Sequence, residues 1–363
     1  MQDADSAQAE TAQTDTGQTD TGQTETAQAD TGQIPEMGFV FEYVTHQVQG
    51  ETLTFVLNRE SPDWFSQKLR QTAVPNAVLG HLQALARICA ASGTALPRYA
   101  DFGANVGVSA LYPARLGFPT LAVEAGARNI ALLTEAVAIN DLAPLCRPCL
   151  MAAGAGRGVV PFHEYSAWGW LELPDRPLAS AGQVVAVRDR PGALRISLMP
   201  TDTVAGILTQ QGFADAACIK IDIEGSEMAA LTGFEAIAAR PTLRDLIVES
   251  NGAECANLGY PVQVLWARLI ELGFALYMIL GRRLAPAGPD TPQPRLVMDM
   301  LATRRDPAEL TGGFGYRIAA FSPTELTEMF ATLESQNPAV GVPAFAAQQK
   351  ALMVAASPST TTQ

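Results

Sequence analysis

Between Pro97 and Thr303 the chain alternates short apolar runs with longer segments in which apolar residues recur every three or four positions. Runs of the first kind predict β-strands, and segments of the second kind predict helices. The predicted strands are RYADF, TLAVE, RPCLMAA, CIKIDI, LRDLIVES, FALYMIL and PRLVMDMLAT, and the predicted helices cover 104–116, 126–140, 225–238 and 261–272. This alternation predicts a doubly wound α/β fold of about seven mostly parallel strands, with ligands bound at the carboxyl ends of the strands.

The chain before this region has two different parts. From Thr11 it repeats TAQTD, TGQTD, TGQTE, TAQAD and TGQ, which contain no large apolar residue, so residues 1–35 are expected to be disordered. Such a tail is either a flexible acidic spacer or repeat sequence without a role, and we favour the second. Residues 36–96 contain two strand-like runs around Gln49-Gly50, predicting a hairpin, and then two helical patterns, the first starting at Ser61-Pro62. They form an N-terminal accessory segment.

The predicted domain covers 97–305, with an insertion at 156–200, and residues 306–363 form a C-terminal extension with a loose tail. The insertion contains VVPFHEYSAWGW, QVVAVRD and LRISLMP, which predict short antiparallel strands. An insertion on the ligand side is either a substrate lid or a peripheral hairpin that covers a sheet edge. His163 lies among its aromatic residues and is a candidate general base, while the aromatics either stack on a substrate or form local core.

Charge and composition restrict the partners and the compartment. The net charge of −13 includes seven acidic residues within 1–33, and without them 30 acidic residues face 24 basic ones. A mildly acidic body argues against binding to nucleic acid or to an anionic membrane. We expect no membrane span, because no apolar run reaches about 18 residues, and an acidic N-terminus argues against a secretory signal, so a cytoplasmic location is expected. Five cysteines predict reduced thiols, and Cys146 and Cys149 lack the second pair that a zinc site would need.

Two motifs carry the first functional signal. In YADFGANVGVSA, Asp101 ends a strand, and Gly103 and Gly107 allow a sharp turn into a helix that starts near Val106. This spacing differs from the GxGxxG of dinucleotide-binding enzymes. In TLAVEAG, about 20 residues later, Glu124 ends the next strand, where a carboxylate can accept the hydroxyls of a ribose. Alternatively, Glu124 is an acidic residue that stabilises the start of the following helix.

The stretch CIKIDIEGSEMAALTG carries four charges within eight residues of an apolar strand. Lys220, Asp222 and Glu224 alternate with isoleucines, so we expect them on one face of the strand. Both faces of a doubly wound sheet are normally covered, so a charged face near the carboxyl end predicts a cavity. Glu227 is expected to stabilise the start of the next helix, and for Glu224 helix capping and chemistry are equally favoured.

With this third motif the chain resembles the FkbM family of S-adenosylmethionine-dependent methyltransferases. The family pattern falls on Asp101 to Gly107, Glu124, Asn140, Ile219 to Gly233 and Glu249. The chain departs from it at Ala125, where the family usually has proline, and at Thr201-Asp202, where Leu-Asp is common. The likeness spans about residues 97–303.

The resemblance implies a class I methyltransferase fold, Rossmann-like, with the last strand antiparallel, and methyl transfer usually to oxygen. It implies cofactor contacts at Asp101, Gly103, Asn105, Gly107 and Glu124, with adenine near Ala153. The acceptor expected is a small molecule or glycoside, a sugar or other secondary metabolite. Alternatives are an N- or C-methyltransferase of the same fold, or a protein that binds a nucleoside or cofactor without catalysis.

Asp222 is then expected beside the transferable methyl group, where a carboxylate either removes the proton of the acceptor or positions the acceptor while it balances the sulfonium charge. Lys220 would help to keep it ionised. Glu249 ends the next strand, and with Asp222 and Asn251 it could hold Mg²⁺. Hydrogen bonding to a sugar would use the same oxygens, so we favour a site without metal, and His163 and Glu249 remain further candidates for the catalytic group.

Overall fold

The computed structural model describes residues 40–335 except 62, 75, 166–167, 172–193, 258 and 293–296. The repeats within residues 1–35 and the tail after residue 335 lie outside the described residues. All elements named below belong to the compact unit that starts at Met37.

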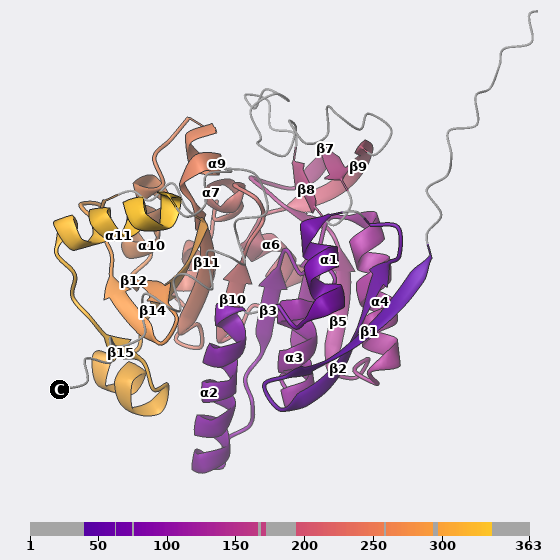
Figure 1. The fold of residues 1–363 in the computed structure, drawn as a ribbon, viewed down its shortest axis with the longest axis horizontal. Helices are drawn as coiled ribbons and strands as arrows, with labels where there is room; N and C mark the ends of the chain where they lie inside the picture. Colours follow the sequence, from indigo (N-terminus) through magenta and orange to yellow (C-terminus); the bar gives the residue numbers. More distant parts are fainter. Residues whose placement is uncertain are drawn as a thin grey trace, which may run out of the picture. The chain divides into compact units, whose positions relative to one another are not determined.

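The described part of the chain forms a central sheet of nine strands in the order β15-β13-β12-β14-β11-β10-β3-β4-β5 (Figure 1). The strands are β3 Tyr99–Phe102, β4 Thr120–Glu124, β5 Cys146–Leu150, β10 Cys218–Ile221, β11 Asp245–Asn251, β12 Ala275–Leu280, β13 Arg283–Pro286, β14 Val297–Thr303 and β15 Arg317–Ile318. Strands β5, β4, β3, β10 and β11 are parallel, whereas β14 runs antiparallel between β11 and β12. This is the expected Rossmann-like, doubly wound arrangement with an antiparallel strand, and β13 and β15 extend it beyond the seven predicted strands.

Helices cover both faces of the sheet. They are α3 Val108–Leu116, α4 Ala127–Ile139, α6 Val204–Gln210, α7 Glu227–Ala230, α8 Glu235–Ala238, α9 Gly252–Asn257 and α10 Gln263–Glu271. On one face Phe234 and Trp266 pack with Ile219 and Ile221 of β10, and on the other Leu111 and the α4 side chains pack with Ala122 of β4. The prediction of a single helix at 225–238 is wrong, because the two short helices α7 and α8 occupy this range.

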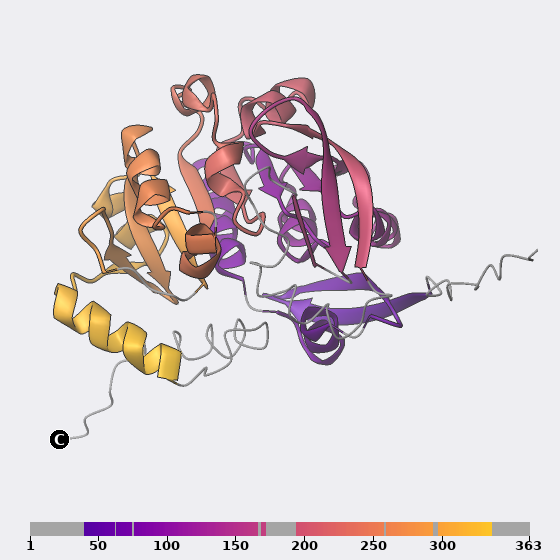
Figure 2. The ribbon, with the colours of Figure 1, turned by 90° about the horizontal axis from the view of Figure 1, so that it is seen from above.

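The accessory segment packs on the α3 and α4 side. It consists of the hairpin β1 Phe41–Val48 and β2 Glu51–Asn58 and the helices α1 Trp64–Gln71 and α2 Ala77–Ser92. Leu53, Phe55 and Leu57 of β2 are buried with the side chains of α3 and α4, so the hairpin completes the core on that face (Figure 2). Helix α1 is capped by Asp63, whose side chain accepts from the amide of Ser66, and not by the predicted Ser-Pro pair.

The insertion forms a separate small sheet in the order β6-β9-β7-β8. Its strands are β6 Ala152–Ala153, β7 Gly158–Tyr165, β8 Trp168–Leu171 and β9 Leu194–Asp202, and the run QVVAVRD lies outside the described residues. Phe162 and Met199 face inward and pack with Ala152 and Ala125. The small sheet therefore lies against the start of α4, beside the end of β4.

A buried ion pair lies at the opposite, amino end of the central strands. The Nε2 of His81 on α2 is 3.2 Å from Asp245 Oδ2, and both side chains are fully buried. Arg305 donates to both oxygens of Asp245, and the ring of His81 stacks on Phe314, beyond the π-helix η1 Glu309–Gly313. From the sequence, a histidine on a helix of the accessory segment is expected to be an ordinary surface or half-buried residue. For His81 this expectation is wrong, because it is fully buried beside Asp245.

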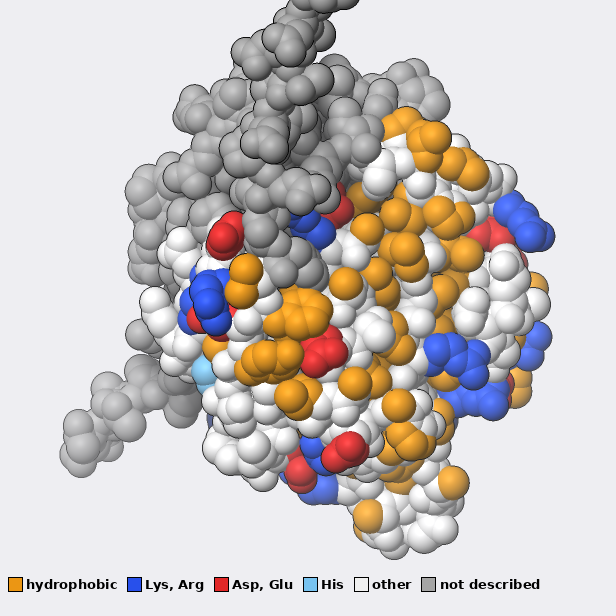
Figure 3. All heavy atoms as spheres, turned by 90° about the vertical axis from the view of Figure 1, so that its right-hand side faces the viewer, with side chains coloured by type: hydrophobic (Ala, Val, Ile, Leu, Met, Phe, Trp, Pro, Cys, Tyr) orange, Lys and Arg blue, Asp and Glu red, His pale blue; other side chains and the backbone are white. Residues whose placement is uncertain are grey.

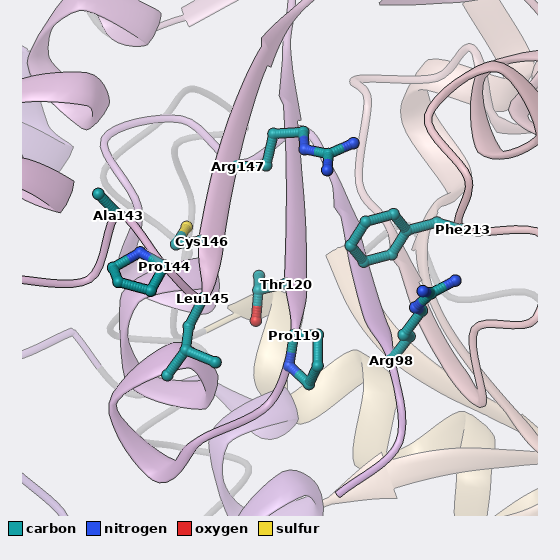
Figure 4. A pocket seen from close by; sticks show the side chains of 9 residues that line it. All are labelled: Arg98, Pro119, Thr120, Ala143, Pro144, Leu145, Cys146, Arg147 and Phe213. Carbon is teal, nitrogen blue, oxygen red and sulfur yellow. The ribbon is translucent and has the colours of Figure 1, made fainter.

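A small pocket of about 180 Å³ also lies at this end of the sheet (Figure 4). Thr120 and Cys146, the first residues of β4 and β5, line it together with Phe213. The ring of Phe213 lies between the guanidinium groups of Arg98 and Arg147, at 5.3 and 5.8 Å from its centre. Both arginines donate to carbonyls of the loop that carries Phe213, so they fasten this loop. The pocket is at the edge away from the carboxyl ends of the strands.

The distribution of basic side chains on the surface and the state of the cysteines are in line with the composition. Over the face shown in Figure 3, arginine and lysine side chains lie in small separate groups. All five cysteines are free, as expected, and burial raises the pKa of Cys146 to about 12. In the described part of the chain we find no helix that is both long and apolar enough to cross a membrane.

The last helix among the described residues is α11, Pro323–Ser335.

Candidate functional site

The backbone amides of the turn after β3 all donate hydrogen bonds to other groups of the protein. The amides of Gly103 and Ala104 donate to Val123 O, that of Asn105 to Glu124 Oε2, that of Val106 to Asn105 Oδ1 and that of Gly107 to Ala104 O. Helix α3 then starts at Val108, two residues later than expected. The five amides of residues 103–107 are thus satisfied within the protein, and the turn is closed without a ligand.

Close packing requires glycine at both glycine positions of this turn. Gly103 has a φ of +83°, and a Cβ there would lie 1.7 Å from Asp222 O. Gly107 has a φ of +98°, and a Cβ there would lie 2.6 Å from a methyl carbon of Leu133. Asn105 has a φ of +51°, in the left-handed region that asparagine tolerates better than most residues. The sequence spacing therefore encodes a turn in contact with the start of the 222–225 loop.

Glu124 joins this turn to the next helix. Its Oε2 accepts from the amide of Asn105 at 2.8 Å, and its Oε1 accepts from the amide of Gly126 at 2.7 Å. The side chain is 7% exposed. Burial raises its pKa to about 7, against the opposing effect of the two amides. The side chain of Asn129 is a third hydrogen-bond partner, and since a carboxylate has about four acceptor positions, it can still accept a hydrogen bond from a ligand.

Glu164 of β7 is a neighbour that the sequence reasoning missed. It is buried, its Oε1 accepts from the amide of Arg128 at 3.2 Å, and its charge also raises the pKa of Glu124. The available signal was the alternation along β7, in which Val160 and Phe162 face the same side as Glu164. The insertion therefore brings a second carboxylate to the predicted ribose side.

Lys220 connects the first and third motifs. Its Nζ lies 3.3 Å from Asp101 Oδ1, 3.1 Å from Asp222 Oδ2 and 3.3 Å from Gly103 O. Burial alone would lower the pKa of Lys220, but the charges of the two carboxylates outweigh it and raise that pKa. Asp101 is fully buried on this contact, whereas the side chain of Asp222 is 32% exposed. Asp222 is therefore the more accessible of the two carboxylates held by Lys220.

Three acidic residues form a row across neighbouring strands. Glu249 pairs with Asp299 across β11 and β14, and Asp222 directly follows Ile221, which pairs with Val248. Residues 222, 249 and 299 thus occupy adjacent positions on the face that carries Lys220. Burial raises the pKa of Glu249 well above its usual value, and the charge of Asp222 is the next largest cause. The row therefore contains one carboxyl group that resists ionisation. Asp299 was also missed, although it interrupts the apolar run LVMDML.

Glu224 and Glu227 have different surroundings from those expected. Strand β10 ends at Ile221, and Glu224 has a φ of +56°, so the prediction that it shares the strand face with Lys220 is wrong. The Oε1 of Glu227 accepts from the amides of Ile223 and Gly225, and the side chain is buried. Burial raises its pKa to about 7. Glu227 thus stabilises the loop before α7, as its predicted capping role suggested, through the loop amides.

The remaining predicted site residues lie at or near the carboxyl edge. Ala153 is buried on β6, next to the end of β4, where Met151 donates to Glu124 O. His163 lies on β7 opposite Ile196, and its side chain lies outside the described residues. Asn251 Oδ1 accepts from the amide of Glu254 and so caps α9. Asn140 also has a structural contact, because its side chain binds the backbone of Thr54.

No group of three or more histidine, cysteine or acidic side chains converges on a metal site within the described ranges. The predicted set of Asp222, Glu249 and Asn251 therefore gains no support as a Mg²⁺ site. Asp202, whose role was uncertain, accepts from the amide of Thr203 and from Gln210 Nε2, so it holds the start of α6.

Comparisons with known proteins find only distant structural likenesses. No family model matches the chain, and no curated protein matches it. The 16S rRNA methyltransferase RsmC of T. thermophilus, solved with AdoMet and guanosine, is 15% identical with a TM-score of 0.37, over 75% of this chain. This chain spans about half (52%) of that enzyme.

Two further solved structures are also methyltransferases. The human methyltransferase 10 domain containing protein is 13% identical, with a TM-score of 0.30 over 63% of this chain and 83% of that one. The CcbJ methyltransferase of Streptomyces caelestis is 13% identical, with a TM-score of 0.25 over 48% and 49%. At TM-scores below 0.5 these likenesses decide neither the reaction nor the acceptor of this chain. The expectation that it binds no nucleic acid stays a prediction, as does its cytoplasmic location.

Proposed function

We propose that this chain is an S-adenosylmethionine-dependent methyltransferase of the FkbM type, and that it methylates a hydroxyl oxygen of a sugar or secondary metabolite. The observation that carries the proposal is the closed turn at 103–107 together with the carboxylate of Glu124 at the end of the next strand. Turns that hold a pyrophosphate offer free amides to it, and this turn has used those of residues 103–107. The groups that remain are hydrogen-bond acceptors with negative charge.

Such a set of acceptors fits a nucleoside that has hydroxyl groups and a positive charge but no phosphate. Glu124 would accept from the ribose hydroxyls, and Ala153 at the neighbouring strand end would border the adenine. Gly103 and Gly107 would fix the turn beside the ligand, because only glycine fits against Asp222 and Leu133. When bound, S-adenosylmethionine supplies a methyl group on a positively charged sulfur. Asp222, half-exposed beside the turn, offers the negative charge that suits such a group.

Asp222 is the candidate that removes or orients the proton of the acceptor hydroxyl. It is held by Lys220 at 3.1 Å, and its side chain is 32% exposed, so an acceptor can reach it. Glu249 is less available as a base, because burial and the charge of Asp222 raise its pKa and favour its protonated form. His163 is retained as the alternative base from the insertion. We place the acceptor, a small molecule or glycoside, on the β10 and β11 side of Asp222.

Calorimetry with the full chain tests the cofactor. We expect S-adenosylmethionine and S-adenosylhomocysteine to bind with affinities on the order of micromolar, and NAD⁺ to give no heat. Glu124→Ala should abolish binding, and Glu124→Gln should weaken it strongly. The matched control is Glu135→Ala on α4, whose carboxylate accepts from Tyr43 OH on the hairpin, and binding should persist. Wild-type protein that is folded and binds neither adenosyl compound would refute the proposal.

A further inference from the structure

Asp222, Glu249 and Asp299 bring three carboxyl groups side by side at the ends of β10, β11 and β14. Acidic side chains directly opposite one another in a sheet destabilise it, since their Cβ atoms lie about 4.5 to 5.5 Å apart. Glu249 and Asp299 are such a pair, and Asp222 stands next in the row. Within the row, Asp222 also has a cationic partner, Lys220, at 3.1 Å.

Glu249 is the least satisfied member of the row. It is 8% exposed, and its Oε2 is buried without a hydrogen-bond partner among the described residues. A buried carboxyl oxygen left unpaired costs on the order of 1 to 3 kcal/mol. Such a cost is expected where the group is kept for a ligand that donates a hydrogen bond or carries positive charge.

The position of Glu249 separates it from the predicted cofactor contacts. In the sheet order β11-β10-β3-β4, it lies two strands from the glycine turn and three from Glu124. With neighbouring strands about 4.8 Å apart, these separations are roughly 10 and 14 Å. Asp222 lies between the two regions. A partner of Glu249 therefore belongs to the acceptor side of Asp222.

The geometry favours an organic cation over a metal ion. Mg²⁺ is usually held by one or two carboxylates and keeps several waters, so it needs an open, hydrated position, whereas Glu249 is only 8% exposed. An ammonium group needs only one or two carboxylates within hydrogen-bond distance. The nearby ammonium group of Lys220 is already shared between Asp101 and Asp222.

We propose that Glu249, with Asp222 and Asp299 beside it, forms a subsite for the protonated amine of the acceptor, so that the acceptor is an amino alcohol such as an amino sugar. This rests on the proposed function. The ammonium group would bind at Glu249 and so hold a neighbouring hydroxyl against Asp222. A neutral sugar would leave Glu249 unpaired, and the subsite would therefore select against it.

The subsite predicts that a cationic ligand releases a proton from the protein when it binds. Glu249 holds its proton to unusually high pH, and an incoming ammonium group favours the ionised carboxylate. Binding of the cation should therefore release a proton from Glu249. A neutral ligand should release none. The released proton is seen in calorimetry as a binding enthalpy that changes with the ionisation enthalpy of the buffer.

The experiment uses the full chain saturated with S-adenosylhomocysteine at pH 7, in phosphate and in Tris. Glucosamine is titrated as the probe, with glucose and N-acetylglucosamine as neutral counterparts. We expect glucosamine to bind at least about tenfold more tightly than either, with release of up to one proton. Glu249→Gln should remove both the preference and the proton release. Glu271→Gln, an exposed carboxylate on α10, is the matched control and should change neither.

Three outcomes would overturn the subsite. One is equal binding of glucosamine and glucose, or glucosamine binding without proton release. Another is loss of S-adenosylhomocysteine affinity in folded Glu249→Gln, which would assign the carboxyl group to the cofactor. The third is binding of MgCl₂ with proton release and displacement of glucosamine. If Glu249→Gln fails to fold, Asp299→Asn replaces it and should weaken glucosamine binding at least about threefold. Failure of the wild type to bind S-adenosylhomocysteine would instead refute the proposed function.

Discussion

The ammonium nitrogen of Lys220 lies 3.1 Å from Oδ2 of Asp222, and the same nitrogen lies 3.3 Å from the buried Asp101. One cation thus holds the exposed carboxylate at the site and neutralises the carboxylate beneath it. Because Gly103 O also faces this nitrogen, the ends of β3 and β10 are joined at one point.

Replacing Lys220 with methionine should destabilise the protein by about 3 to 5 kcal/mol, because Asp101 would remain as a buried charge without its partner. Adding Asp101→Asn should recover most of that loss. Urea unfolding of the two single variants and the double variant measures both effects. The control is Asp215→Asn, which breaks only the exposed pair with Arg98 and leaves the other contacts of Arg98 in place, and it should cost less than about 1 kcal/mol. A similar small loss in Lys220→Met would contradict the structural role.

Affinity for S-adenosylmethionine should rise with pH through neutrality. The pKa of Glu124 is raised to about 7, so its carboxylate is mostly protonated at pH 6 and mostly ionised at pH 8. If only the ionised form binds, the dissociation constant falls by about tenfold between these two values. Calorimetry across this range measures it. Glu124→Gln should show a flat profile, and a rise that persists in this variant would assign the titration to another group.

Gly103→Ala should prevent normal folding of the site, since a methyl group there meets the carbonyl of Asp222 at 1.7 Å in a backbone conformation that alanine avoids. We expect a loss of several kcal/mol in unfolding free energy, together with loss of cofactor binding. The matched control is Gly80→Ala within α2, where the added Cβ meets nothing within 4 Å. That change should stabilise the protein by about 0.5 to 1 kcal/mol. Wild-type stability of Gly103→Ala would disprove the close contact.

Asp245→Asn should cost about 3 to 5 kcal/mol in unfolding free energy, because Arg305 and His81 lose their buried partner. The pKa of Asp245 is lowered to about 2, against the effect of burial, by His81 and Arg305. A lowered folded-state pKa gives stability that is present above the ordinary value near 3.9 and lost as pH falls through about 2. Acid unfolding followed by circular dichroism should therefore show a smaller slope between pH 4 and 2 in Asp245→Asn. An unchanged slope would contradict this assignment.

The central strands and the glycine turn could be predicted from the sequence, because their signals are local. The run TLAVE is apolar up to Glu124, and Gly103 and Gly107 mark the turn without knowledge of any distant residue. All seven predicted strands are present in the sheet. The additional strands β13 and β15 have four and two residues, too short to produce a distinct apolar run.

The arrangement of the site could not be predicted from the sequence, because it depends on contacts between segments that are far apart in the chain. Glu249 and Asp299 face each other only because of the register of β11 and β14, which are 46 residues or more apart in sequence. The face of Glu224 was predicted wrongly because the alternation of charge and isoleucine continues in sequence for two residues after the strand has ended. The burial of His81 was missed because it too depends on a distant residue, its partner Asp245.

The internal hydrogen bonds of the turn at 103–107 have a consequence for the kinetics of ligand capture. A loop that is already ordered spends little conformational entropy when a ligand arrives, so more of the contact energy remains as affinity. Its association rate should then be set by diffusion and access, without a slow rearrangement of this segment. Amide hydrogen exchange in residues 103–107 should consequently be slow in the free protein and change little when the site is filled.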